Sequence, residues 1–367
     1  MAEKAIRLGG ESTADAIVGA VDAMYTEHTF AEKDFALKHN EDEISVDTNF
    51  AAQNFWKEAL IRFFNKKSAV LGLVLIVVIV LLAVFGPGMN SYTYSGQDLS
   101  QKNFAPRVPG IEQLGILDGS EKMSTTTGTK VTNAYQEKDK PDVYYWFGSD
   151  LYGRDIWTRT WEGARVSLII AVAAAIIDMV IGMSYGLISG YFGGRVDMVM
   201  QRFLEVANGI PRLVIVTLLL LVLQPGMVTI IFALMLTEWV GMSRIARAEM
   251  LKLKDQEFVL ASRTLGAGSF FIIFKEVLPN IIGPIITQVM FSIPTAIFTE
   301  AFLSFVGLGI PVPQCSLGSL ISELYNSFTT HPYQIIPPMV VMSLLMMSFN
   351  LVADGLREAL DPKMKSM

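Results

Sequence analysis

Two carboxyl groups, those of Asp178 and Glu300, fall inside long apolar stretches of the sequence. An acidic side chain is costly inside a membrane, and it usually has a role there. Such a group can relay protons, line a polar path, or bind a neighbouring helix by a hydrogen bond. For Asp178 a hydrogen bond between helices is the simpler interpretation. For Glu300 we expect a role in packing or gating rather than direct contact with a ligand.

Other residue types that carry chemistry are sparse or scattered. The single cysteine, Cys315, excludes an internal disulfide and a cysteine-based metal cluster, and the three histidines lack the spacing of metal ligands. The chain contains no GxxxxGK[ST] phosphate loop and no nucleophile–base pattern. We therefore expect no catalytic, metal or cofactor site in this chain, and a membrane enzyme is the least supported class.

The composition predicts an all-α polytopic membrane protein. Of the 367 residues, 51% are hydrophobic and 17% are charged, whereas soluble domains carry about a quarter charged residues. Residues 1–50 hold 11 acidic and 4 basic residues, while the remainder holds 24 acidic and 25 basic residues. The net charge of −6 therefore originates in the first 50 residues and gives no indication of a nucleic-acid partner.

The apolar runs and the positions of the bases predict six transmembrane helices with both termini in the cytosol. Residues 55–67 mix aromatic and basic side chains, a pattern typical of an amphipathic helix on the membrane surface. The expected segments are a cytosolic tail (1–54), the interfacial helix (55–67), the first transmembrane helix (68–86), an extracellular loop (87–165), a five-helix core (166–356) with a cytosolic loop (243–280), and a cytosolic C-terminus (357–367).

One stretch of uncharged residues, 213–237, is long enough to be a single tilted helix. Pro225 and Gly226 lie in its middle, and this pair favours a turn over a helix interior. A single helix would also place the five bases between Arg244 and Arg263 outside the cell, against the positive-inside rule. We therefore predict two spans here, extended backwards past Pro211 and forwards to about Met242.

The loop between the fourth and fifth spans contains a short predicted helix with a sharp end. Asp255 is expected to cap it, Glu257 lies in its positively polarised first turn, and Gly266 follows where a left-handed residue would end it. The residues that share one face of this helix are Phe258, Ala261, Ser262 and Leu265. This small knob suits a cleft on another protein, although an amphipathic helix resting on the lipid surface explains the pattern equally well.

The stretch from Glu257 to Asn280 resembles the EAA loop of permease subunits in binding-protein-dependent ABC importers, which has the pattern EAA, three residues, Gly, nine residues and I-x-L-P. The residues that match are Ala261, Gly266, Leu278 and Pro279, whereas Leu260, Ser262 and Glu276 depart from the pattern.

Three further segments resemble the peptide-importer branch of these permeases. They are GSDLYGRDIWTRTWEGARVSL (148–168), TEAFLSFVGLGIPVP (299–313) and FNLVADGLREALDPK (349–363), with Ala353 in place of a family glycine. The four motifs together cover about residues 55–365 and are similar to the C-type permeases of the dipeptide, oligopeptide and nickel group. Residues 110–145 fall outside the resemblance and look like an external insertion, a feature that weakly favours oligopeptide systems.

The resemblance implies the type I ABC importer permease fold in a bacterial cell membrane, and uptake of oligopeptides. It also implies a second, paralogous permease, two P-loop ATPase subunits that use ATP and Mg²⁺, and an extracellular substrate-binding protein. Residues Asp255 to Gly266 would then couple the ATPase to the spans. Three side chains before the second span, Arg154, Asp155 and Arg159, would either dock the binding protein or anchor the external loop.

Two alternatives to oligopeptide uptake remain open from the sequence. Nickel or another small ligand fits the same kind of importer, because the choice of ligand would lie mostly in the binding protein. A stand-alone secondary transporter, with Asp178 and Glu300 carrying protons, would need no ATPase partner. The motif spacing and the docking loop have no use in such a carrier, and they favour the importer.

Overall fold

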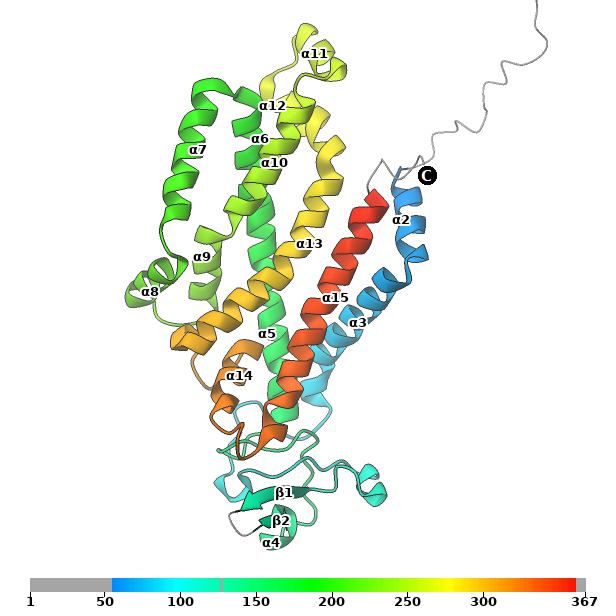
Figure 1. Ribbon diagram of the computed structural model, residues 1–367, viewed down its shortest axis with the longest axis vertical. Coiled ribbons are helices and arrows are strands. Elements are labelled where there is room, and N and C mark those ends of the chain that lie inside the picture. The colour runs from blue at the N-terminus through cyan, green and yellow to red at the C-terminus, as the bar shows by residue number, and fades with distance from the viewer. Residues whose placement is uncertain (1–54, 126–127, 361–367) are drawn as a thin grey trace, which may run out of the picture. The chain divides into compact units, whose positions relative to one another are not determined.

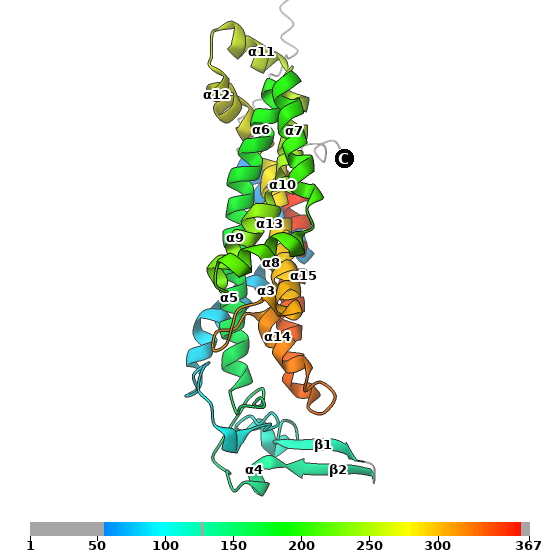
Figure 2. The same cartoon turned by 90° about the vertical axis from the view of Figure 1, so that its left-hand side faces the viewer.

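The structure is a computed structural model that describes residues 55–125 and 128–360, and in this part of the chain helices dominate. The long helices extend between two ends, one marked by α11 and the other by the strands β1 and β2 (Figures 1 and 2). We call these the α11 end (residues 254–271) and the hairpin end (residues 87–155). The tail predicted at 1–54 and most of the predicted C-terminal segment lie outside the described residues.

The bundle is built from long helices, which are α2 (Phe55–Asn65), α3 (Lys67–Phe85), α5 (Ile156–Ile177), α6 (Met183–Phe192), α7 (Gly194–Gly209), α8 (Arg212–Val222), α9 (Met227–Thr237), α10 (Trp239–Leu253), α13 (Leu278–Leu303) and α15 (Ile336–Leu360). Short α-helices are α4 (Ala134–Glu137), α11 (Glu257–Thr264), α12 (Ser269–Phe271) and α14 (Leu317–Tyr325). Segments of π-helix are η5 (Asp178–Gly182), η6 (Ile272–Val277) and η7 (Ser304–Leu308). Single turns of 3₁₀-helix are η2 (Gly86–Gly88), η3 (Leu99–Gln101), η4 (Ile111–Leu114) and η8 (Pro332–Gln334).

Five continuous helical stretches within the described residues are long and apolar enough to cross a membrane. They comprise 67–88, 156–192, 227–253, 269–308 and 332–360. The second stretch begins about ten residues earlier than the predicted span, because Asp155 caps α5 by accepting a hydrogen bond from the Thr158 N–H at 2.8 Å. A sixth span arises only if the bent pair α7 and α8 crosses as one unit.

The break predicted at Pro225 and Gly226 is confirmed, since α8 ends at Val222 and α9 begins at Met227. The predicted extension of the third span past Pro211 is wrong as a straight helix, because α7 and α8 meet at 77°. Proline disfavours helical backbone at the residue before it, and Ile210 is accordingly extended, with φ −83° and ψ 125°. The Pro211 ring therefore ends α7 and turns the chain before α8.

The expectation of an all-α chain is also corrected, because the external insertion contains a β-hairpin. Strand β1 (Ser120–Thr125) pairs with β2 (Gly128–Asn133) in antiparallel register from Ser120 opposite Asn133 to Thr125 opposite Gly128. Both strands are polar, so the alternation of apolar and polar residues that marks a half-buried strand is missing from the sequence. The only indication of strands in this part of the sequence is its threonine and valine residues, which favour extended backbone.

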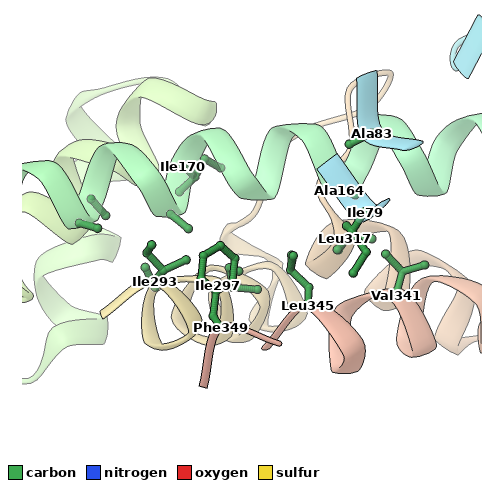
Figure 3. Packing of buried hydrophobic residues seen from close by; sticks show 14 of the residues in the cluster. Ile79, Ala83, Ala164, Ile170, Ile293, Ile297, Leu317, Val341, Leu345 and Phe349 are labelled. Atoms are coloured by element: carbon green, nitrogen blue, oxygen red, sulfur yellow. The ribbon is translucent and has the colours of Figure 1, made fainter. Parts of the chain in front are cut away.

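The main core lies where α3, α5, α9, α13, α14 and α15 meet. Figure 3 shows Ile170 of α5 facing Ile293 and Ile297 of α13, with Leu345 and Phe349 of α15 packed beside them. Each of these side chains is at most 7% exposed. Helix α5 thus packs directly against α13 and α15, which places α5 at the centre of the bundle.

Helices α6 and α10 approach each other unusually closely. Gly182, Gly186 and Gly190 recur every four residues, so they form one face of the helix that runs from η5 into α6. A Cβ atom on Gly186 would lie 2.1 Å from the backbone oxygen of Ser243, and one on Gly182 would lie 2.5 Å from that of Trp239. Only glycine allows this contact, which is typical of tightly packed membrane helices.

At the hairpin end, a compact network of charges joins α5 to α14. Asp150 Oδ2 accepts hydrogen bonds from Arg154 Nε at 2.6 Å and from Arg159 Nη1 at 2.9 Å. Glu323 of α14 accepts from the second nitrogen of each guanidinium, and its contact with Arg159 Nη2 is 2.8 Å long. Burial opposes ionisation of Glu323, but the charges of Arg159 and Arg154 outweigh it and lower the pKa of this carboxyl. The two arginines and the two acidic residues of this network therefore carry equal and opposite charge.

We expect Gly186→Ala to destabilise the protein, because its methyl group must push α10 away from α6. Overpacking of this kind costs roughly 1–3 kcal/mol. Gly241→Ala is the matched control, since a Cβ atom added to Gly241 in α10 would meet no atom within 4 Å. Thermal unfolding of both variants in detergent would check this, and equal melting temperatures would contradict the close approach.

Glu323→Gln should destabilise the hairpin end by about 1–3 kcal/mol, because two buried guanidinium groups then share one carboxylate. At neutral pH the variant should lose the whole contribution of the Glu323 carboxylate to the free energy of unfolding. Since folding lowers the pKa of Glu323, its contribution begins to fall below the ordinary value of 4.5 and disappears as the pH drops through the folded value.

Unfolding followed at pH 7 and at acid pH would measure this difference. Glu162→Gln is the control, because its partner Arg165 is 44% exposed and the pair should contribute little. A difference between Glu323→Gln and the parent protein that grows on acidification would exclude the proposed balance of charges.

Candidate functional site

The predicted docking helix exists as α11, which extends over residues 257–264 at the α11 end of the bundle (Figure 2). Its N-cap is Gln256, with extended backbone, so the expected cap at Asp255 is wrong by one residue. Asp255 lies in the turn that follows α10. Glu257 occupies the first turn as predicted, where the positive end of the helix dipole favours a carboxylate.

Helix α11 ends at a left-handed glycine. Gly266 has φ +85°, its N–H donates to the Arg263 carbonyl at 3.0 Å, and the Ala267 N–H donates to the Ser262 carbonyl at 3.0 Å. These two bonds form the Schellman arrangement that closes a helix and reverses the chain. The predicted role of Gly266 in ending the helix is therefore confirmed by its backbone.

The two faces of α11 have opposite environments. Val259 is fully buried in a cluster with Ile272, Ile273 and other apolar residues of η6. On the other face Phe258 is 38% exposed and Leu265 is 88% exposed. Ala261 is exposed and Ser262 is partly buried, so most of the predicted face points away from the rest of the described chain.

The buried side of α11 connects it to three spans. The cluster around Val259 also contains Leu187 of α6, Met250 of α10 and Ile281 of α13. In addition, the Arg263 guanidinium lies 5.5 Å from the centre of the Tyr191 ring at the end of α6. The buried side of α11 is thus close-packed into the same apolar cluster as these spans.

The contact of Arg263 with Tyr191 had no signal in the sequence. The two residues are separated by 72 positions, and neither belongs to a recognisable spacing pattern. It was missed because a cation–π contact depends on tertiary placement alone.

Glu300 is fully buried and is held by hydroxyl groups. Its carboxylate accepts hydrogen bonds from Ser316 at 2.5 Å, Ser304 at 2.8 Å and Ser167 at 3.2 Å. Ser167 belongs to α5 and Ser316 is the N-cap of α14. The carboxylate thus joins α5, α13 and the start of α14, a geometry that fits packing.

Asp178 is placed differently. It begins the π-helical segment η5 between α5 and α6, and the residue is 3% exposed. Its Oδ1 atom is fully buried and has no hydrogen-bond partner among the described residues. Asp178 and Glu300 therefore do not share a site, and the structure does not link them into a proton path.

The three residues considered for docking of a binding protein are buried. Arg154 is 3%, Asp155 is 1% and Arg159 is 0% exposed. The arginines belong to the network with Glu323, and Asp155 caps α5 while accepting a hydrogen bond from Asn90 Nδ2 at 2.8 Å. Docking would need a surface that these side chains do not offer, so we correct that interpretation in favour of anchoring the loop.

Comparison with known proteins gives two family matches. Residues 182–366 match the family described as binding-protein-dependent transport system inner membrane component. Residues 54–106 match the N-terminal transmembrane domain of oligopeptide transport permease C. The first match includes α11 and all of the bundle from the end of η5 onwards.

Individual relatives agree with these families. The chain is 41% identical to the oligopeptide transport system permease protein OppC of Bacillus subtilis over 312 residues, which cover 85% of this chain and 91% of that protein. It is 38% identical to the dipeptide transport system permease protein DppC of the same organism, over 90% of this chain and 93% of that protein. The corresponding dipeptide permease of Lactococcus lactis is 40% identical, over 90% of this chain and 97% of that protein.

Among solved structures, a methionine ABC transporter in an inward-facing conformation covers 55% of this chain and 94% of its own, with 18% identity and a TM-score of 0.46. That likeness is too low to support a conclusion. The family matches and the curated relatives are sufficient: the chain belongs to the inner membrane components of binding-protein-dependent transport systems, in the branch of the dipeptide and oligopeptide permeases.

Proposed function

We propose that this chain is a permease subunit of an ABC importer for oligopeptides and that α11 receives the motion of a separate ATPase subunit. The observation that carries the proposal is the two-sided environment of α11. Its inner face is locked to α6, α10 and α13 through the Val259 cluster, and its outer face is exposed. An exposed apolar face beside a rigid connection to the spans is suited to transmit force from a partner.

The importer needs partners that supply what this chain lacks. Since the sequence contains no phosphate loop, ATP and Mg²⁺ would be bound by two P-loop ATPase subunits. A second, paralogous permease would complete the translocation path, and an extracellular binding protein would deliver the peptide. The names of the oligopeptide and dipeptide relatives support a peptide as the ligand.

This function also sets the orientation in the membrane. The α11 end would face the cytosol, where the ATPase subunits act, and the hairpin end would face outwards. The bases of the α11 end, Lys252, Lys254 and Arg263, agree with the excess of positive charge on the cytosolic side. Both termini would then be cytosolic, with six crossings if α7 and α8 act as one broken span.

Leu265→Glu should weaken binding of the ATPase subunits by roughly tenfold, as expected for loss of an apolar anchor at an interface. Leu265 is 88% exposed, so the change should leave the fold intact. Leu114→Glu is the matched control, because Leu114 is 76% exposed at the hairpin end. Co-purification of ATPase subunits with each tagged variant measures the effect, and an unchanged yield with Leu265→Glu would argue against α11 as the contact.

Gly266→Asp should leave membrane insertion intact but abolish peptide uptake. A non-glycine residue in the left-handed conformation costs about 1 kcal/mol, and this strain would weaken the two hydrogen bonds that end α11. Gly268→Asp is the control, since Gly268 has φ −69° and its Cβ position is equally open. ATP-dependent uptake by both variants checks this, and normal transport by Gly266→Asp would refute the coupling role of α11.

A further inference from the structure

A second pair of charges lies deep in the bundle, where two broken helices meet. Arg212 begins α8, Glu238 separates α9 from α10, and the Arg212 Nη1 atom lies 2.6 Å from Glu238 Oε1. In the candidate span 227–253, Glu238 follows 11 helical residues and precedes 15. At about 1.5 Å per residue, it lies roughly 17 Å from one end and 23 Å from the other. The pair is therefore near mid-membrane.

The exposed fraction of these two charged side chains, at this depth, argues against a hydrocarbon environment. The Arg212 side chain is 50% exposed on the described chain, and that of Glu238 is 11% exposed. A charged side chain near the middle of a bilayer is costly unless it faces water or protein. The surface that carries Arg212 is therefore directed towards a polar space or another polypeptide.

A cavity of about 280 Å³ opens beside the pair, between α8, α9 and α13. Its walls are largely apolar and include Thr237, Thr295 and Thr299, whose hydroxyl groups donate to backbone carbonyls of their own helices, with Arg212 at one side. Thr299 Oγ1 also lies 3.5 Å from Glu238 Oε1. Such a volume is at the lower limit of ligand pockets, so it suits one apolar side chain and not a whole oligopeptide.

A third ionisable residue, Asp178, lies near the ion pair but is not part of the cavity wall. It lies one turn before Gly182, against which the first residue of α10 packs. Asp178 Oδ1 is buried without a hydrogen-bond partner among the described residues. The unpaired Oδ1 atom of Asp178 and the carboxyl group of Glu238 can therefore both accept a hydrogen bond from a further donor.

We infer that the Arg212–Glu238 pair and its cavity form the place where this chain contacts the amino end of a peptide during passage. The α-ammonium group of the peptide replaces Arg212 as the partner of Glu238, while the first side chain of the peptide enters the cavity. This assignment rests on the proposed function. A lipid tail has no donor group for Glu238 or for the unpaired Oδ1 atom of Asp178, so it fits the observations less well.

The test uses the complete importer in proteoliposomes with a tripeptide whose first residue is the photoreactive p-benzoyl-phenylalanine. Illumination during ATP-driven uptake should attach the peptide to α9 or α13 near Thr237 and Thr299, which mass spectrometry of fragments would locate. Glu238→Gln should lower this labelling about tenfold or more, as expected when a charge-assisted contact is removed. Glu205→Gln should change nothing, because Glu205 pairs with Arg202 on the exposed surface of α7.

The Arg212→Gln variant distinguishes loss of peptide binding from damage to the protein structure. It breaks the same ion pair but keeps the carboxylate of Glu238, so labelling should persist or increase. A pair with a merely structural role predicts that both variants lose labelling together, which would overturn the inference. Labelling of the parent complex on the partner permease alone would overturn it as well. Failure of the parent complex to take up the tripeptide with ATP would instead contradict the proposed function.

Discussion

The fold depends on one constraint, which is that polar groups inside a bilayer must find their partners within the protein. The Glu300 carboxylate meets it with three serine hydroxyls, and these bonds hold α5, α13 and α14 together. Arg212 and Glu238 meet it with each other. Asp178 does not meet it fully, since its Oδ1 atom is buried and unpaired among the described residues. Buried polar atoms of this kind are uncommon in folded proteins.

The two ends of the bundle are stiff for different physical reasons. At the hairpin end, two arginines and two acids balance their charges and fix α14 to α5. At the α11 end, close-packed apolar residues and the glycine face of α6 leave no room for independent movement. The breaks lie between these ends, at Pro211 and at Pro225–Gly226. Proline and glycine thus interrupt the helices between the two stiff ends, where kinks are expected.

Much of this arrangement could be predicted from the sequence, because each feature has a local cause. The apolar runs indicated the spans, Pro225 and Gly226 indicated the break, and Gly266 indicated the end of α11. Features with non-local causes were missed or misjudged. The hairpin has no apolar alternation, and Arg154 and Arg159 looked available for docking because their partner Glu323 lies more than 160 residues away. Pro211 indicates a break in the helix, but the angle of 77° between α7 and α8 depends on how the helices pack.

The same residues explain why a transport path would lie beside α8 and α9 and not along α5. Helix α5 is surrounded by α3, α9, α13, α14 and α15, so its centre is filled with side chains that are almost fully buried. Helix α8 is short and begins at Arg212, and it leaves a cavity against α9 and α13. Helix ends expose backbone groups that a continuous helix would satisfy, and polar side chains and water are tolerated there. The interrupted helices thus place the Arg212–Glu238 pair beside a cavity, which the filled core around α5 does not offer.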